Sequence, residues 1–239
     1  MLDPAERSGI LRDSLAVGVA TGAYGLGFGA VSVASGLSVA QTCVLSLLMF
    51  TGASQFALVG VVAAGGSPLS GAATALLLGT RNTLYGLRMA PLLQWRGWRR
   101  AGAAHVLIDE STAMSVGRDN TAAARLGFLA TGIAVFVLWN LATLVGALAG
   151  GAVGDPRTFG LDAAVAAAFL ALLWPRLKDR RNVLVGVLAA AVALSMVPVS
   201  AAGVPVLAAG GVALLVGVLA RQQDPTEIPG PDDVAGGHR

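Results

Sequence analysis

Charged residues are scarce in this chain of 239 residues, because Asp, Glu, Lys and Arg make up only 12% of it, against about 25% in ordinary soluble domains. Hydrophobic residues make up 55%, and a further 32 residues are glycine. A water-soluble domain, a disordered chain and a coiled coil all need more polar surface than this composition supplies. The sequence therefore predicts an integral membrane protein embedded in the lipid bilayer.

Cysteine and histidine are almost missing. Because Cys43 is the single cysteine, neither an intrachain disulfide nor a thiolate metal cage can form. The two histidines, His105 and His238, are too few for a multi-histidine metal site. So few histidines also make a catalytic site of a membrane-embedded enzyme, which would combine His with Asp and Ser or with metal ligands, an unfavourable interpretation. The sequence contains no P-loop nucleotide-binding motif. We therefore expect no metal, no cofactor and no enzymatic activity.

Arginine supplies nearly all of the positive charge, since Lys178 is the only lysine among 16 basic residues. The basic residues lie mainly in loops between apolar stretches, as the positive-inside rule expects. The net charge of +3 therefore does not indicate a nucleic-acid-binding surface.

Seven stretches are apolar and close to the length of about 20 residues that a membrane-spanning helix needs. They cover residues 14–34, 42–64, 68–90, 125–149, 161–178, 183–200 and 204–220. The loops between several of them are short, so we expect one all-α, polytopic helix-bundle domain over residues 1–220. Residues 221–239, rich in Pro, Gly and Asp, are expected to form a disordered acidic tail.

The membrane topology is consistent at the C-terminal end and conflicting at the N-terminal end. Arg7 and Arg12 favour an N-terminus on the inside, but three simple crossings would then place the arginines of residues 96–100 outside. Two solutions stay open. Either a span between residues 42 and 90 is broken or re-entrant, or the weakly apolar stretch 101–117 crosses the membrane as well.

The first span carries four glycines at helical spacing. They are Gly18, Gly22, Gly25 and Gly29. Steps of three and four residues put all of them on one helical face, where the missing side chains let a second helix approach closely. We interpret this face as a helix-packing surface. A second interpretation stays open, in which the glycines of 25–29 also loosen the helix beside a substrate path.

The second span has a polar centre formed by Gly52, Ser54 and Gln55. Gln55 needs hydrogen-bond partners where no water reaches, and Gly52 allows the backbone to unwind. Discontinuous helices in transporters expose free N–H and C=O groups near the midplane of the membrane. The centre therefore predicts either a substrate site or a hydrogen bond that holds two helices together.

Arg81 and Asn82 lie near the centre of the third span. An arginine at that depth costs about 2.5–3.5 kcal/mol on insertion scales, so a buried carboxylate, a set of carbonyls or an anionic substrate must offset its charge. A guanidinium binds a carboxylate through two parallel hydrogen bonds. A structural ion pair and a substrate site are both consistent with this position.

Two neighbouring carboxylates, Asp109 and Glu110, lie between apolar flanks. Three interpretations stay open: they form a proton relay, they pair with Arg81, or they lie in a solvated loop.

Four segments together resemble a known family. They are Gly25-Leu26-Gly27-Phe28-Gly29, Thr51-Gly52-Ala53-Ser54-Gln55-Phe56, Arg81-Asn82-Thr83-Leu84-Tyr85-Gly86-Leu87 and Asp109-Glu110-Ser111. In order and spacing they resemble the motifs of the AzlC family of branched-chain amino acid permeases, the azaleucine-resistance proteins. The resemblance covers about residues 10–120. It departs from the family at Thr51, where Ala is frequent, and at Asn82, where His is common, and the two departures predict a substrate preference that differs from that of other members.

The resemblance implies a multi-pass exporter of branched-chain amino acids, and in some members methionine, in the bacterial inner membrane. It also implies efflux driven by an ion gradient and a small hydrophobic partner subunit of the AzlD type. The competing classes are a membrane channel and a scaffold subunit that transports nothing itself. A channel would show a polar stripe along several helices, whereas here the polar residues gather at one depth.

A substrate site can be assembled from these residues as a hypothesis. Arg81 takes the carboxylate of a zwitterionic amino acid, and Gln55 with the carbonyls near Gly52 takes its ammonium. Phe28 or Phe56 contacts the aliphatic side chain, with Ser54 and Asn82 completing the site. Asp109 or Glu110 carries a coupling proton.

Overall fold

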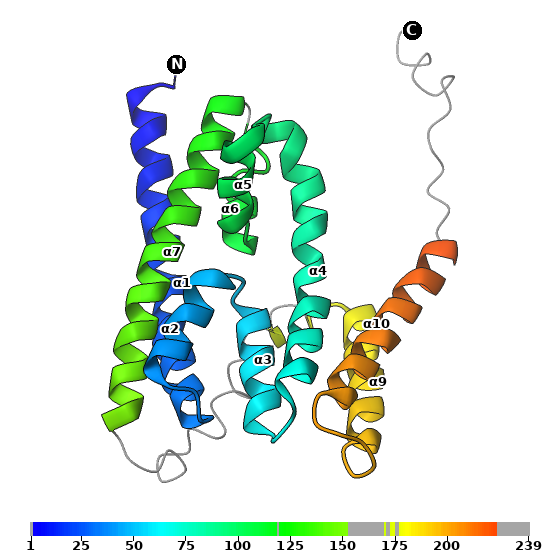
Figure 1. The fold of residues 1–239 in the computed structure, drawn as a ribbon. Helices are drawn as coiled ribbons and strands as arrows, with labels where there is room; N and C mark the ends of the chain where they lie inside the picture. The colour runs from blue at the N-terminus through cyan, green and yellow to red at the C-terminus, as the bar shows by residue number, and fades with distance from the viewer. Residues whose placement is uncertain (1, 119, 153–169, 171–172, 175–176, 224–239) are drawn as a thin grey trace, which may run out of the picture. The chain divides into compact units, whose positions relative to one another are not determined.

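The computed structural model describes residues 2–118, 120–152, 170, 173–174 and 177–223. Every regular element in these ranges is a helix, as the all-α prediction requires (Figure 1). The helices are α1 (Pro4–Ala34), α2 (Val39–Leu48), α3 (Ala53–Ala63), α4 (Pro68–Leu93), α5 (Gly97–His105), α6 (Asp109–Ala113), α7 (Thr121–Ala152), α9 (Arg180–Met196) and α10 (Val204–Gln223).

Two of these helices, α1 with 31 residues and α7 with 32, are long and apolar enough to cross a membrane. They lie side by side along their length (Figure 1). The predicted number of seven spans is not established, because the fifth predicted span, 161–178, falls almost entirely outside the described residues.

The four glycines of the first span are buried where α1 meets α7. A Cβ on Gly18 would lie 2.8 Å from the Cβ of Ala134, and one on Gly22 would lie 2.7 Å from the Cβ of Leu138. A Cβ on Gly25 would lie 2.5 Å from the Trp139 carbonyl oxygen, and one on Gly29 would overlap the carbonyl oxygen of Thr143. The backbones of the two helices therefore touch along this face, which only glycine permits.

The second predicted span is not one helix. It divides into α2, which ends at Leu48, and α3, which begins at Ala53, and Gly52 between them adopts φ 62° and ψ −90°. This is a backbone conformation that L side chains rarely adopt, so the glycine fixes the position of the break. The structure therefore contains a break between residues 42 and 90, as one of the two solutions to the topology conflict requires, while the direction of each crossing stays a prediction.

The other solution required residues 101–117 to cross as a helix, and here the structure has two short helices instead. α5 ends at His105 and α6 spans only Asp109–Ala113. The third predicted span, in contrast, is continuous, because α4 starts at the Ser67 cap and extends over 26 residues. The central helix α4 is thus intact, while a broken pair of helices precedes it and another follows it.

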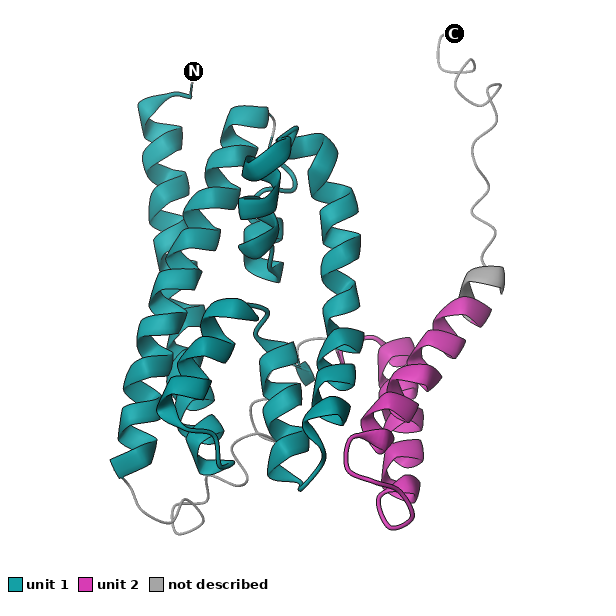
Figure 2. Cartoon of the chain, in the orientation of Figure 1, with its two compact units in different colours: residues 1–175 teal, residues 176–239 magenta. Residues whose placement is uncertain are grey.

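The chain divides into two compact units, residues 1–175 and 176–239 (Figure 2). In the second unit α9 and α10 pack against each other and correspond to the last two predicted spans. α9 is capped by Asp179, whose side chain accepts a hydrogen bond from the Arg181 N–H. The single domain expected over residues 1–220 stays a prediction. Most of the predicted tail, residues 224–239, lies outside the described part of the chain.

Candidate functional site

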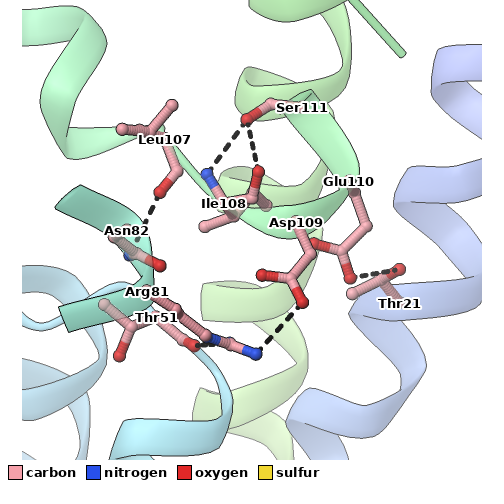
Figure 3. A network of polar contacts seen from close by, with 9 residues as sticks. All are labelled: Thr21, Thr51, Arg81, Asn82, Leu107, Ile108, Asp109, Glu110 and Ser111. Carbon is pink, nitrogen blue, oxygen red and sulfur yellow. Dashed lines mark hydrogen bonds and ion pairs between the residues drawn. The ribbon is translucent and has the colours of Figure 1, made fainter. Parts of the chain in front are cut away.

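Arg81 of α4 forms an ion pair with Asp109, the first residue of α6. The Arg81 Nη1 lies 3.1 Å from the Asp109 Oδ2 (Figure 3). The two side chains are 33% and 30% exposed, so the pair is shielded from most of the surrounding medium. The sequence left three interpretations of the two carboxylates open, and in the structure one of them, Asp109, pairs with Arg81.

Arg81 also contacts the broken second span. Its Nη2 donates to the carbonyl oxygen of Thr51 over 3.4 Å. This carbonyl lies in the interruption between α2 and α3, where the helical pattern of hydrogen bonds stops. One guanidinium therefore joins the α2–α3 break to the start of α6 (Figure 3).

Asn82, the next residue of α4, makes the corresponding contact with the second break. Its Nδ2 donates to the carbonyl oxygen of Leu107 over 3.2 Å, and Leu107 lies in the turn between α5 and α6. Two consecutive residues of the continuous helix α4 thus bind backbone carbonyls from both broken pairs of helices. The sequence places Arg81 and Asn82 at the centre of a span. Only the tertiary structure shows that their side chains bind backbone carbonyls at both helix breaks.

Each break is closed locally by a side chain three residues further on. The Gln55 Oε1 accepts from the Gly52 N–H over 3.1 Å, and its Nε2 donates to the Leu45 carbonyl over 3.5 Å. At the second break, the Ser111 Oγ accepts from the Ile108 N–H over 3.0 Å. At each break, a side chain at the third helical position thus accepts from the backbone N–H of the residue before the helix, which is one half of a capping box. Ser111 was not singled out from the sequence as a site residue, because the usual residues at that position of a capping box are Glu and Gln.

Glu110 points towards α1 rather than towards Arg81. The hydroxyl of Thr21 donates to the Glu110 Oε1 over 3.5 Å (Figure 3). Within the described residues, the ion pairs of the chain do not include Glu110. Both carboxylates face neighbouring helices, so the interpretation of Asp109 and Glu110 as a solvated loop is wrong. Thr21 was not predicted, although a hydroxyl within an apolar span is a usable signal.

Several buried polar atoms around this ion pair have no hydrogen-bond partner within the described part of the chain. They are the Thr51 Oγ1, Ser54 Oγ, Arg81 Nε, Asn82 Oδ1 and Thr112 Oγ1. Most buried polar groups in proteins are hydrogen-bonded, and each exception needs an explanation such as water or a ligand. The set contains both donors and acceptors, which is what a zwitterionic ligand requires.

The predicted aromatic residues lie in the core beside these groups. Phe28 is fully buried, and its ring centroid lies 5.4 Å from that of Phe56 and 6.0 Å from that of Trp139. Phe56 is in the first turn of α3, next to Ser54 and Gln55. The three rings pack together and support the turn that carries the polar side chains.

Comparison with known proteins gives one family. The family model described as "AzlC protein" matches residues 16–153, a range that contains the ion pair, both breaks and the α1–α7 contact. No solved structure matches the chain significantly.

Relatives occur in bacteria and archaea. An uncharacterized membrane protein of Archaeoglobus fulgidus is 34% identical over 170 residues, which is 70% of this chain and 74% of the relative. An uncharacterized membrane protein of Helicobacter pylori is 26% identical over 179 residues, covering 72% of this chain and 77% of the relative. The match over more than half of the chain, together with these relatives, shows that the chain is a membrane protein that belongs to the AzlC family.

Proposed function

We propose that this protein is a secondary transporter that exports branched-chain amino acids across the bacterial inner membrane, with methionine as a further substrate. One observation carries the proposal: Arg81 lies where two broken helix pairs meet, surrounded by buried donors and acceptors without partners. Discontinuous helices that meet at a charged group are typical of substrate sites in secondary transporters. The family to which the chain belongs is of the transporter type, and no enzymatic step is proposed.

The arrangement suits the two charges of an amino acid. The Arg81 Nε is a buried donor without a partner, and it is available to a substrate carboxylate while the Nη1 stays on Asp109. The hydroxyls of Thr51 and Ser54 are further buried polar groups without partners within the described residues. Gln55 acts mainly on the protein itself, because it caps the break at Gly52. It therefore shapes the site instead of binding the ammonium directly.

Glu110 is the group we propose for energy coupling. It is held by the hydroxyl of Thr21 and has no ion pair within the described residues, so its carboxylate is free to take either a proton or the ammonium of the substrate. Because both bind the same carboxylate, each displaces the other. A proton that enters down its gradient then drives the amino acid out, which is antiport in the direction of export.

A small hydrophobic subunit of the AzlD type is proposed as the partner, supported by the membership of this chain in the AzlC family. A channel is the competing class, and the ion pair of Arg81 with Asp109, which joins α4 to the start of α6, favours a binding site over an open pore. A scaffold subunit that transports nothing is the alternative that the next experiment excludes.

The proposed activity is measured by efflux. Cells that express this chain together with the candidate partner are loaded with leucine, isoleucine, valine or methionine from dipeptides, and the released amino acid is followed with time. We expect faster release of the branched-chain amino acids than from empty-vector cells. Release of all four at the empty-vector rate, with and without the partner, would support a scaffold role and contradict the proposal.

Replacing Glu110 with Gln tests the coupling. The amide retains the hydrogen bond from Thr21 but cannot exchange a proton, so we expect leucine exchange to continue at lower affinity, because the ammonium loses a charged partner, and its stimulation by a pH gradient to disappear. Proteoliposomes with and without an imposed gradient provide the measurement, and Glu6→Gln, at an exposed position near the start of α1, is the matched control. A gradient response in Glu110→Gln equal to that of the unmodified protein would show that another group carries the proton.

A further inference from the structure

A cavity of about 420 Å³ is lined by residues of α4, α5 and α7. Along α4 the lining extends from Asn82 to Leu93, a rise of roughly 16 Å for a helix. This rise is close to half of the hydrocarbon core of a bilayer, which is about 30 Å thick, and therefore to the depth of one leaflet. The cavity is long enough for a lipid acyl chain and longer than a single amino acid.

The walls of the cavity are apolar, and part of them is open to the outside. Met89, Leu93 and Phe128 line the cavity and are almost fully buried. Leu87 also lines it and is 70% exposed, and the lining residue Ala104 of α5 is exposed as well. Because these wall residues are exposed, the cavity can be entered from the side of the helices, where a membrane supplies hydrocarbon.

One end of the cavity is positively charged. Arg100, in the first turn of α5, belongs to the lining. The guanidinium of Arg125 lies 5.9 Å from the centre of the ring of Trp95, which lines the cavity too. Arg125 is fixed there, because its Nε donates to the Leu93 carbonyl oxygen over 2.9 Å. Within the described residues the ion pairs include neither arginine, so both charges are available to an anion.

The charged end lies where a membrane surface is expected. Trp95 follows the end of α4, and Figure 1 shows the end of α4 together with the starts of α1 and α7 at one end of the first unit. α1 and α7 are long enough to cross a membrane, so their starts lie near its surface. The exposed Arg96 and Arg99 add further positive charge there. Such an arginine-rich end is expected at the cytoplasmic face, where anionic lipids attract basic segments.

We infer that this cavity binds an anionic phospholipid, with the phosphate at Arg100 and Arg125 and one acyl chain along the apolar wall of α4. A planar guanidinium binds a phosphate through two parallel hydrogen bonds. Basic pockets between membrane helices bind anionic head groups in this way. The match is one of charge and shape together, because the cavity joins a cationic end at the surface to an apolar wall one leaflet deep.

The inner end of the cavity adjoins the second helix break. Asn82 and Leu107 both line the cavity, and the Asn82 Nδ2 donates to the Leu107 carbonyl oxygen. An acyl chain that extends to this end packs against α4 and α5 at once. The bound lipid therefore stabilises α5 beside α4, next to the contact that holds the break.

An amino acid is the competing occupant, and the lining does not suit it. Among the described residues the lining contains neither Asp nor Glu, so an ammonium would leave water without a counterion, which is unfavourable. The Asn82 amide offers no replacement, because its Nδ2 is on the Leu107 carbonyl and its Oδ1 is buried. A phospholipid places only hydrocarbon in the apolar part of the cavity and keeps its polar groups at the charged end.

Replacing Arg100 with Gln tests the head-group contact. Native mass spectrometry of the purified full-length chain measures the retention of dioleoyl phosphatidylglycerol, which is anionic, and of dioleoyl phosphatidylcholine, which has the same acyl chains and no net charge. We expect phosphatidylglycerol to bind roughly 25-fold more tightly, since each of the two arginines contributes a factor of about five. Arg100→Gln should reduce this preference about fivefold. Arg99→Gln is the matched control, because Arg99 does not line the cavity, and it should change the preference by less than about twofold.

A second pair of substitutions on α5 tests the acyl-chain contact by filling the cavity. Ala104 lines the cavity and Ala101 does not, and both are exposed alanines, so replacing each with Phe makes the same chemical change at two places. We expect Ala104→Phe to weaken the binding of both lipids by at least about tenfold, and Ala101→Phe to weaken neither. The charge variant thus changes the preference between head groups, and the filling variant changes the affinity for the shared acyl chains.

Three results would overturn the inference. Equal retention of the two lipids by the unmodified chain would show that the arginines bind no head group. Equal retention of phosphatidylglycerol by Ala104→Phe and Ala101→Phe would place the lipid elsewhere on the surface. Displacement of bound phosphatidylglycerol by leucine would make the cavity an amino-acid site. None of these measurements depends on transport, so a failure of leucine export in the efflux experiment leaves the lipid site standing.

Discussion

Replacing Arg81 with alanine is expected to reduce leucine export about 100-fold, because hydrogen bonds to a charged group contribute about 1.5–3 kcal/mol each and each 1.36 kcal/mol is a factor of ten. The substitution removes the contact with the Thr51 carbonyl and the proposed contact with the substrate carboxylate. It also leaves Asp109 without its cation. Breaking a fully buried pair in this way costs about 3–5 kcal/mol, and the cost here is smaller because the pair is about one third exposed.

The control for this prediction separates folding from transport. The double replacement Arg81→Ala with Asp109→Ala removes both charges, so we expect it to restore the yield and thermal stability lost in Arg81→Ala while export stays absent. Arg81→Lys keeps the positive charge, but an ammonium cannot form the two parallel hydrogen bonds that a planar guanidinium forms with a carboxylate. We therefore expect only weak export from this variant. Export at the unmodified rate in both Arg81→Ala and Arg81→Lys would remove Arg81 from the substrate site.

Replacing Gly29 with leucine is expected to prevent α1 from packing against α7. A Cβ at Gly29 would overlap the Thr143 carbonyl oxygen and lie 2.6 Å from the Ala147 nitrogen, and both atoms belong to the rigid backbone of α7. Overpacking of a close contact costs about 1–3 kcal/mol, and more when backbone atoms must move. We therefore expect little folded protein, measured as the monodisperse fraction on size-exclusion chromatography after heating in detergent.

Gly27 provides the control on the same helix. A Cβ at Gly27 has no atom within 4 Å, so Gly27→Leu introduces the same side chain two residues away without a clash. Because leucine favours the helix over glycine by up to about 1 kcal/mol, this variant should be at least as stable as the unmodified protein. Equal melting temperatures for Gly29→Leu and Gly27→Leu would show that the close α1–α7 contact contributes nothing to stability.

Some features of the site can be read from the sequence because they depend on local chemistry. A glycine among polar residues in an apolar span predicts a weak point in a helix, and the break occurs at Gly52. An arginine within a span needs a counterion, and the two carboxylates at 109 and 110 are the nearest acidic candidates along the chain. The sequence does not distinguish between them, because neighbouring residues on a helix point in different directions. The fold turns Asp109 towards Arg81 and Glu110 towards Thr21.

Other features could not be predicted because they join residues far apart in the chain. The contact between Asn82 and the Leu107 carbonyl depends on how α4 packs against the turn between α5 and α6. The number of spans is also not a matter of hydropathy alone. Residues 42–64 are as apolar as a crossing helix, yet they form two short helices, since a glycine and a capping glutamine stabilise an interruption that hydropathy does not register.

The sequence by itself determined the class of protein, the family and the face on which α1 packs, because apolar composition, ordered motifs and glycine spacing are local properties of the chain. The tertiary structure decided which carboxylate neutralises Arg81 and where the two breaks meet. The physical reason is the range of each effect. Hydrophobicity and helix spacing act within about one helical turn or span, whereas a buried charge is neutralised by whatever group the fold brings within a few ångströms.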